Sequence, residues 1–495
     1  MLDQIIRFSI QNKTVIGLLT IGLIAWGTWS FRQLPIDAVP DITDNQVQVI
    51  TNAPSQSAPD IERLVTFPVE QTMATIPGIE EIRSFSRFGL SVVTIVFKES
   101  VDVYWARQQV SERLVAAQSE IPKGIGTPKL APVSTGLGEI YQYIIHPEKG
   151  YEAKYDRMKL REIQDWIVRR QLLGVEGVAD VSSFGGYLKQ YEIAFNSQAL
   201  RSMNVSLQEV FAALEKNNQN TGGAYINRRP NAWYIRSEGL IKTLDDIREI
   251  SIKRTPGGIP IRIRDVATVG FGHAVRYGAM TKNDEGEVVG AVVLMLKGAN
   301  SSKVIENVKV RIDQIRKTLP EGVVIEPYLD RTKLVDRAIS TVATNLTEGA
   351  LIVIFVLVLL LGNLRGSLVV ASVIPLAMLF AIAMMNLFGV SGNLMSLGAI
   401  DFGLIVDGAV IIVEGTLHHL TKSIAGKQLD QKGMDEEVFQ SARKLRKSAA
   451  FGEIIILIVY LPILALLGVE GKMFKPMMNV FVISRNEAAH LRIGR

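Results

Sequence analysis

The chain has 495 residues, of which 48% are hydrophobic and 21% charged, and its formal net charge is +5. A mean hydropathy of +0.22 indicates membrane-spanning segments beside long soluble ones, because a purely soluble chain of this size is less apolar. The small net charge carries no signature of nucleic-acid binding. The lack of cysteine excludes a disulfide framework and thiolate metal sites. No phosphate-binding loop, nucleophile elbow or HExxH motif occurs, so we expect no enzyme activity.

The N-terminus predicts a membrane anchor. Residues 1–13 place apolar and polar side chains on opposite sides of a helix, which is typical of an interfacial segment. Residues 14–32 are almost entirely apolar and long enough to cross a bilayer once. Arg7 and Lys13 precede this span and favour a cytoplasmic N-terminus. No small-residue cleavage pattern follows it, so we expect the anchor to be retained.

Residues 33–334 contain no span, and their first part, residues 33–135, alternates strand and helix patterns. That rhythm predicts a split βαβ, or ferredoxin-like, module. The predicted strands and helices are Gln46–Thr51 (strand), Ala58–Thr75 (helix), Val92–Phe97 (strand) and Val103–Gln118 (helix).

A second module resembles a copy of the first. Glycine, two apolar positions, serine and phenylalanine fall in the same register in residues 69–85 and 168–184, which predicts a duplicated fold. The second copy is split into residues 136–190 and 273–334 by an insertion over residues 191–272. Aromatic side chains of the second copy are expected in its core, namely Trp166, Phe184 and Tyr187.

The insertion carries a turn-rich stretch that predicts a protruding hairpin with arms at Ala224–Ile226 and Trp233–Arg236. A mobile loop and an interaction arm both fit this pattern.

The membrane pattern returns after residue 337. Four further spans are predicted, at residues 338–361, 367–387, 394–415 and 448–467. The polar stretch 416–447 contains several lysines and arginines and is expected to be a cytoplasmic loop. The fold class is therefore an α+β membrane protein, with five transmembrane helices and a large soluble region.

The span 394–415 contains three carboxylates, Asp401, Asp407 and Glu414. An acidic side chain at mid-membrane costs at least about 2.5–3.5 kcal/mol, so three in one helix indicate ion or proton movement. Asp407 and Glu414 lie within about 20° of each other on a helix, and Asp401 lies about 120° away. We predict that all three form a proton relay. Two alternatives stay open: Glu414 as a residue at the membrane boundary, and Asp401 as a residue that lines a cation path or pairs with another helix.

Five stretches resemble the heavy-metal efflux branch of the resistance–nodulation–division (RND) transporters. They are Leu34–Thr43, Thr135–Tyr141, Gly185–Tyr191, Asn393–Glu414 and Val469–Met477. The resemblance implies a homotrimeric, multi-pass pump of the bacterial inner membrane that expels metal cations and uses the inward proton gradient. It further implies a periplasmic soluble region, a periplasmic adaptor protein and an outer-membrane channel as partners. No cofactor is implied besides the transported cation and the proton, and the metal ligands are unknown.

The same resemblance implies that the hairpin belongs to a docking subdomain and reaches a neighbouring subunit. The residues expected to serve that contact are Asn217, Tyr225, Arg228, Arg229 and Trp233. Within the branch, the acidic span resembles the divalent-cation type, which exports zinc, cobalt or cadmium; the copper/silver type is the alternative. Multidrug members carry two adjacent aspartates, whereas Gly408 follows Asp407 here.

The C-terminal segment, residues 468–495, departs from the family pattern after about residue 477, where a sixth span is expected. A full member also has a second half with six more spans. We therefore expect a truncated, inactive N-terminal half, with a non-pumping binding or scaffold subunit of the complex as the alternative.

Overall fold

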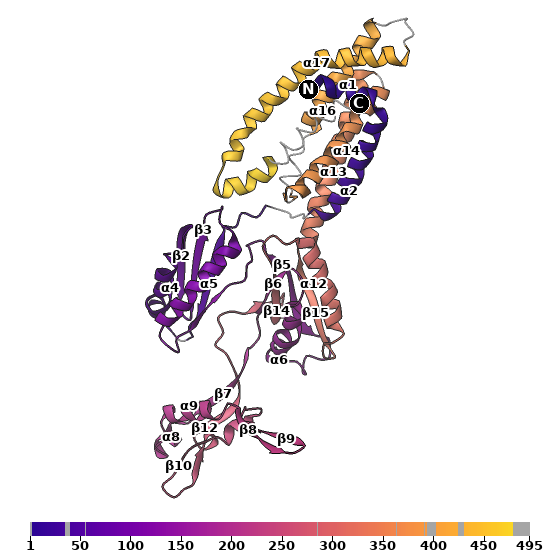
Figure 1. Ribbon diagram of the computed structural model, residues 1–495. Helices are drawn as coiled ribbons and strands as arrows, with labels where there is room; N and C mark the ends of the chain where they lie inside the picture. Colours follow the sequence, from indigo (N-terminus) through magenta and orange to yellow (C-terminus); the bar gives the residue numbers. More distant parts are fainter. Residues whose placement is uncertain are drawn as a thin grey trace.

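The computed structural model describes residues 2–34, 40–54, 56–284, 286–362, 364–390, 392–393, 402–423 and 430–478. A helical region occupies one end of the molecule, two α/β modules lie next to it, and a small insert lies at the far end (Figure 1). The chain enters the first module from the helical region, passes through the second module and the insert, and returns to the helices.

The first module is a four-stranded antiparallel sheet with the strand order β2-β3-β1-β4. This is the order of a ferredoxin-like module, as predicted. The predicted strands and helices are confirmed, and most extend slightly further than the sequence pattern indicates. Its elements are β1 (Gln46–Asn52), α3 (Ala58–Ile61), a π-helical segment (Glu62–Thr66), α4 (Phe67–Met73), β2 (Ile79–Arg87), β3 (Leu90–Phe97), α5 (Val103–Glu120) and β4 (Thr127–Leu130).

Local signals explain where these helices begin. The Ser57 side chain accepts a hydrogen bond from the Asp60 backbone N–H, and Asp102 accepts from Tyr104 and Trp105. Such side-chain caps satisfy backbone donors that have no partner within the helix. Alternate residues of β1 and β3 then pack against α4 and α5 to form one apolar core, which includes Val49, Ile95 and Val110.

The second module repeats this arrangement, with the strand order β6-β14-β5-β15. Gly78 and Gly177 occupy equivalent left-handed positions before β2 and β6, with φ of 83° and 87°, and both modules contain a π-helical segment. The duplication predicted from the sequence is therefore confirmed at the level of strand order. Its elements are β5 (Glu139–Pro147), α6 (Arg157–Ile163), a π-helical segment (Gln164–Val168), α7 (Arg169–Leu172), β6 (Val178–Phe184), β13 (Met280–Thr281), β14 (Glu287–Met295), α12 (Ser301–Arg316) and β15 (Val323–Asp330).

The expected aromatic core of the second module is wrong. Tyr187 is half-buried outside the core, where its ring contacts His273 and Arg276. Trp166 is 60% exposed and Phe184 51% exposed. The Arg170 guanidinium lies over the Trp166 ring at 4.0 Å, so a cation–π contact takes the place of burial. Aliphatic side chains and tyrosines such as Tyr143, Ile145 and Val293 fill the core instead.

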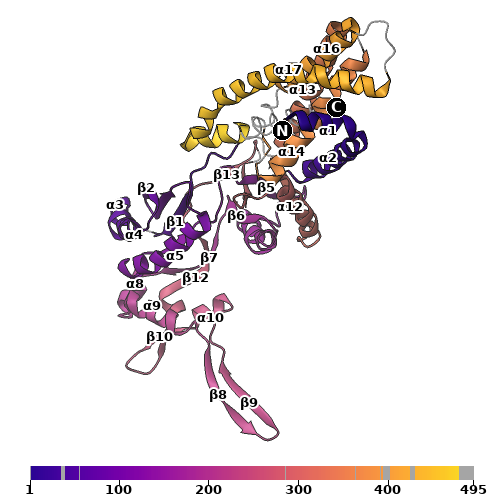
Figure 2. The same ribbon diagram turned by 45° about the horizontal axis from the view of Figure 1, so that its top comes forward.

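The insert has its own core, which includes Val210, Ile263 and Val266, and joins the second module through the two-stranded ribbon of β7 and β12. The hairpin β8–β9 projects from it (Figure 2), and every residue of both strands is exposed. The elements of the insert are β7 (Lys189–Phe195), α8 (Ser197–Ser202), α9 (Leu207–Lys216), β8 (Thr221–Arg228), β9 (Asn231–Ser237), α10 (Leu244–Arg248), β10 (Ser251–Arg254), β11 (Pro260–Arg262), α11 (Ile263–Val266) and β12 (Ala267–His273).

The helical region contains long helices, two of which are long and apolar enough to cross a membrane among the described residues. These two are α2 and α14, so the prediction of five transmembrane helices is not confirmed. The helices of this region are α1 (Leu2–Gln11), α2 (Lys13–Gln33), α13 (Thr332–Leu361), α14 (Leu364–Leu387), α16 (Phe402–Ser423) and α17 (Gln431–Tyr460).

The segment over residues 416–447, predicted as a cytoplasmic loop, is mostly helical in its described parts. Helix α16 continues to Ser423 and α17 begins at Gln431. Phe439 and Ala442 of α17 are buried with Ile6 of α1, so apolar packing holds this polar stretch helical. The predicted span 448–467 is also interrupted, because α17 ends at Tyr460 and a 3₁₀ turn that contains Pro462 follows.

Close contact between α2 and α14 depends on Gly27. A Cβ atom at position 27 would lie 2.6 Å from Leu379 Cβ and 2.8 Å from its carbonyl oxygen. Small residues allow such approach between helices whose other surfaces are apolar.

We predict that Gly27→Ala lowers the free energy of unfolding by about 1–3 kcal/mol, the usual cost of overpacking a tight contact. Gly22→Ala is the matched control on the same helix, because a Cβ there meets no atom within 4 Å. Thermal unfolding of the detergent-solubilised chain measures both variants. Equal melting temperatures for the two would show that the contact at Gly27 is not tight.

Candidate functional site

Helix α16 contains the described part of the predicted proton relay. Asp407 and Glu414 both lie in this helix, two turns apart, whereas Asp401 lies outside the described residues. The side chain of Glu414 is exposed. The helix is apolar apart from these acids and its polar C-terminal turn, so the two acidic positions are its main polar feature.

One face of α16 packs against α14. Ala409 is buried against Val370 and Ile374 of α14, and Val410 and Val413 join the same cluster. Positions 407 and 414 lie about 140–160° around the helix from Ala409. The same side carries Ile411, which is 40% exposed. Val410 lies only about 40–60° from both acidic positions, so these positions are beside the α14 contact and not opposite it.

A third side of α16 contacts α17. Gly415 follows Glu414 directly, and a Cβ at position 415 would collide with the Leu445 side chain of α17. One turn further, His419 Nε2 lies 2.9 Å from Glu437 Oε2. Neither contact is predicted from the sequence, although a glycine inside an apolar helix is itself a signal of close helix approach.

The hairpin β8–β9 brings most of its predicted contact residues together. Tyr225 pairs with Tyr234 across the strands at a ring distance of 6.1 Å. The Arg228 guanidinium lies 5.9 Å from the Trp233 ring, and Arg229 precedes Pro230 in the turn. Asn217 does not belong to the strands: it ends α9, where its side chain donates to the Ala213 carbonyl oxygen at 2.7 Å.

These exposed aromatic side chains form a surface suited to a protein contact. Trp233 is 61% exposed and Tyr234 is 83% exposed. An isolated two-stranded hairpin is only marginally stable in water, and contiguous exposed apolar side chains mark interaction sites.

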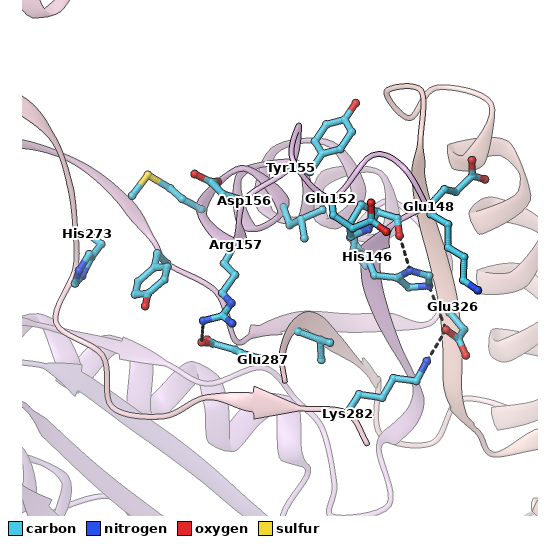
Figure 3. Close-up of a pocket in the computed structure, with 17 residues that line it drawn as sticks. His146, Glu148, Glu152, Tyr155, Asp156, Arg157, His273, Lys282, Glu287 and Glu326 are labelled. Carbon is cyan, nitrogen blue, oxygen red and sulfur yellow. Dashed lines mark hydrogen bonds and ion pairs between the residues drawn. The ribbon is translucent and has the colours of Figure 1, made fainter. Parts of the chain in front are cut away.

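A cavity of 1220 Å³ opens on the second module and is lined by both apolar and charged side chains (Figure 3). Glu326 Oε2 accepts from Lys282 Nζ at 2.7 Å and lies 3.1 Å from His146 Nε2. The hydrogen bond from Lys282, with a smaller contribution from His146, holds the pKa of Glu326 below its ordinary value. Glu287 on the opposite side pairs with Arg157 at 3.2 Å and with Arg276.

Glu326 and Glu287 are therefore occupied by ion pairs with basic side chains. No cluster of three or more His, Asp or Glu side chains suited to a metal ion occurs in the part of the chain that the structure describes. Glu139, which lies on the same strand as His146, accepts from Gln142 Nε2 at 3.2 Å instead.

We predict that Lys282→Met destabilises the second module at neutral pH but not in acid. A carboxylate with a lowered pKa contributes stability above its ordinary pKa of 4.5, and this contribution is lost as the pH falls through the lowered value. Since Glu326 is 42% exposed, the effect is below about 1 kcal/mol. Thermal unfolding at about pH 7 and about pH 3 measures it.

Lys149→Met is the control, because Lys149 lines the same cavity and is not part of the Glu326 ion pairs. A destabilisation by Lys282→Met that persists at the acidic pH would contradict the assignment to Glu326.

Comparison with known proteins places this architecture in a family. The sequence profile of the AcrB/AcrD/AcrF family matches residues 5–488. This match extends past the predicted end of the resemblance at about residue 477. The chain is 47% identical over 490 residues to the cobalt-zinc-cadmium resistance protein CzcA of Cupriavidus metallidurans, covering 98% of this chain and 46% of that protein. It is 36% identical to the cation efflux system protein CusA of Escherichia coli K12, covering 100% of this chain and 47% of CusA.

A solved structure agrees with these relatives. The fold matches an X-ray crystal structure of a heavy metal efflux pump with a TM-score of 0.87 and 33% identity, over 99% of this chain and 47% of that one. The chain thus spans about half the length of the curated relatives it matches. Because the family profile covers nearly all of its residues, the chain belongs to the AcrB/AcrD/AcrF family.

Proposed function

We propose that this chain takes part in the export of divalent heavy-metal cations of the zinc, cobalt and cadmium type. The observation that carries the proposal is the apolar helix α16, which holds Asp407 and Glu414 two turns apart on one side, with the Glu414 side chain exposed. The higher identity to a cobalt-zinc-cadmium resistance protein than to CusA favours this type over the copper/silver type. Since the chain spans about half of these relatives, export is proposed for the assembly that contains it.

The proposed driving force is inward proton movement through Asp401, Asp407 and Glu414. A carboxyl group in apolar surroundings favours the neutral, protonated form, and contact with water favours the charged form. A helix that exposes these groups first to one side of a membrane and then to the other would bind a proton and release it. The transported cation is the substrate, and no cofactor is proposed.

The proposed membrane arrangement has five transmembrane helices in a bacterial inner membrane, formed by α2, α13, α14, α16 and α17. The apolar length of α2 and α14 supports it. Both α/β modules and the insert would then lie in the periplasm, because they follow α2 on the side opposite Arg7 and Lys13.

The proposed assembly is a homotrimer with a periplasmic adaptor protein and an outer-membrane channel. The hairpin β8–β9 supports the trimer, because its exposed aromatic side chains fit a neighbouring subunit. This surface also supports the alternative role, a binding or scaffold subunit that does not pump.

We predict that Asp407→Asn abolishes metal tolerance in cells whose tolerance to zinc, cobalt and cadmium requires this chain. An amide cannot take up and release a proton, so tolerance should fall to that of cells without the chain. Asp313→Asn is the control, because Asp313 is 68% exposed on α12. Growth at graded metal concentrations and the metal content of the cells measure the effect.

Retained export in Asp407→Asn cells would refute the relay. The scaffold role predicts a different result. The native chain and the Asp407→Asn variant would pull down an adaptor protein equally well, and neither would change the metal content of the cells.

We predict that Trp233→Ala weakens self-association of the purified chain, since buried tryptophans at interfaces often contribute about 2 kcal/mol or more. Size-exclusion chromatography with light scattering measures the shift toward monomer. Trp166→Ala is the matched control, because Trp166 is 60% exposed on the second module. An unchanged trimer fraction in Trp233→Ala would exclude the hairpin as the subunit contact.

A further inference from the structure

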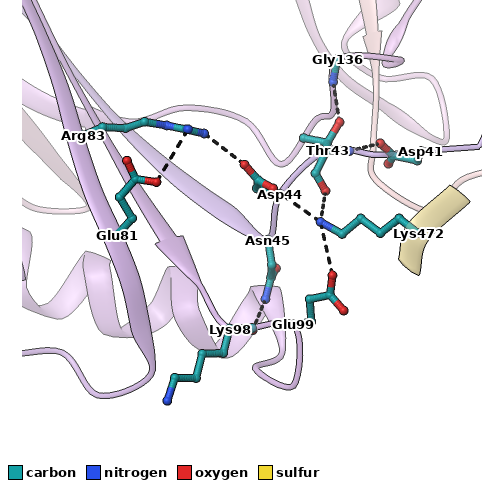
Figure 4. A network of polar contacts seen from close by, with 10 residues as sticks. All are labelled: Asp41, Thr43, Asp44, Asn45, Glu81, Arg83, Lys98, Glu99, Gly136 and Lys472. Carbon is teal, nitrogen blue, oxygen red and sulfur yellow. Dashed lines mark hydrogen bonds and ion pairs between the residues drawn. The ribbon is translucent and has the colours of Figure 1, made fainter. Parts of the chain in front are cut away.

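A single lysine connects the end of the helical region to the first module (Figure 4). Residues 468–478 form a helix that follows α17 and the 3₁₀ turn. From this helix, Lys472 Nζ donates to the Thr43 carbonyl oxygen at 3.0 Å. The same ammonium lies 3.6 Å from Asp44 Oδ1 and 3.8 Å from Glu99 Oε1. Its side chain is only 20% exposed, so one hydrogen bond and two longer ion pairs hold the ammonium in place.

The acceptors on the first module are themselves held in place. Asp44 also binds Arg83 of β2, at 3.1 Å. The Asn45 side chain donates to the carbonyl oxygens of Lys98 and Val101, at 3.2 and 2.6 Å. These contacts fix residue 44 to β2 and residue 45 to the segment that follows β3. A displacement of Lys472 would therefore be transmitted to the sheet of the first module.

The helix on the other side of Lys472 is tied to the acidic helix. Helix α17 contacts α16 at Gly415 and Leu445, next to Glu414. The pair of His419 and Glu437 makes a second link between the same two helices. The described structure therefore connects α16 to Lys472 by packed contacts between α16 and α17 and then by the chain that continues from α17 through the 3₁₀ turn.

The second module is connected to the helical region in another way. Its last strand, β15, is followed almost directly by α13. Asp330 at this junction pairs with Lys309 of α12 at 2.6 Å, and Arg331 donates to the Leu137 carbonyl oxygen. The two modules thus have separate attachments to the helical region, one through α13 and one that includes Lys472.

We propose that Lys472 is a positioning residue that makes the first module follow movements of α16 and α17. The inference rests on the proposed function, because the proton relay supplies the movement. A change of charge on α16 would shift α17, and the helix 468–478 would move with α17. Because Lys472 binds Thr43, Asp44 and Glu99, the first module would then move with this helix. The first and second modules would then move relative to each other during one transport cycle.

The test measures distances in the full chain, which contains no native cysteine that would compete for a spin label. One label is placed on α5 through Arg113→Cys, at an exposed position. The other is placed at the end of α14 through Leu387→Cys, where the native side chain is 64% exposed. Pulsed electron paramagnetic resonance in lipid nanodiscs gives the distance distribution. Asp407→Asn imitates the neutral, protonated relay.

The expected result is a shift of the α5–α14 distance on Asp407→Asn, and loss of that shift when Lys472→Met is also present. Lys472→Arg should restore the shift, because it keeps the charge. Lys475→Met should leave the shift intact, because Lys475 lies on the same helix but does not bind Thr43, Asp44 or Glu99. A second label pair joins the second module, through Val310→Cys on α12, to the same Leu387→Cys on α14. The shift of this distance on Asp407→Asn should be the same with Lys472 and with Lys472→Met.

Two results would overturn the inference: no distance shift on Asp407→Asn, or a shift that Lys472→Met leaves unchanged. The metal-tolerance assay separates this failure from failure of the proposed function. Loss of tolerance in Asp407→Asn together with a shift that does not depend on Lys472 would keep the relay and reject the coupling role.

Discussion

The burial of α14 organises the helical region. Helix α2 packs on it at Gly27, and α16 packs on it through Ala409, Val410 and Val413. Helices with apolar outer surfaces gain little from hydrophobic burial against one another in lipid, so close packing at small residues determines which faces meet. Helix α16 meets α14 through small and β-branched side chains, and its acidic positions lie beside this contact, about 40–60° around the helix from Val410.

The two α/β modules show how one fold accepts a large insertion. In the first module, Phe88 and Gly89 connect β2 to β3 as a tight turn. In the second module, the ribbon of β7 and β12 and the whole insert occupy the equivalent connection between β6 and β14. A surface connection tolerates such growth because the cost of closing a longer loop rises slowly and the core is untouched. The insert can therefore carry the exposed hairpin without changing the sheet order.

The same duplication produces two modules with unlike attachments. The second module continues into α13 through the junction at Asp330 and Arg331. The first module meets the helical region through the chain that leaves α2 and through the contacts of Lys472. Two modules of one fold are thus attached to the same helical region in different ways.

Local periodicity in the sequence was enough to predict the strands and helices of the first module, the duplication, the insertion and the acidic helix. These features repeat every two or every 3.6 residues, or at a fixed offset, and need no knowledge of distant contacts. Tertiary structure alone decided the rest. Residues 431–447 are helical because Phe439 and Ala442 pack on Ile6, Trp166 is exposed because aliphatic side chains already fill the core, and Lys472 meets Thr43 across 429 positions of the chain. Contacts of that separation depend on how whole modules pack, and no local pattern of residues encodes them.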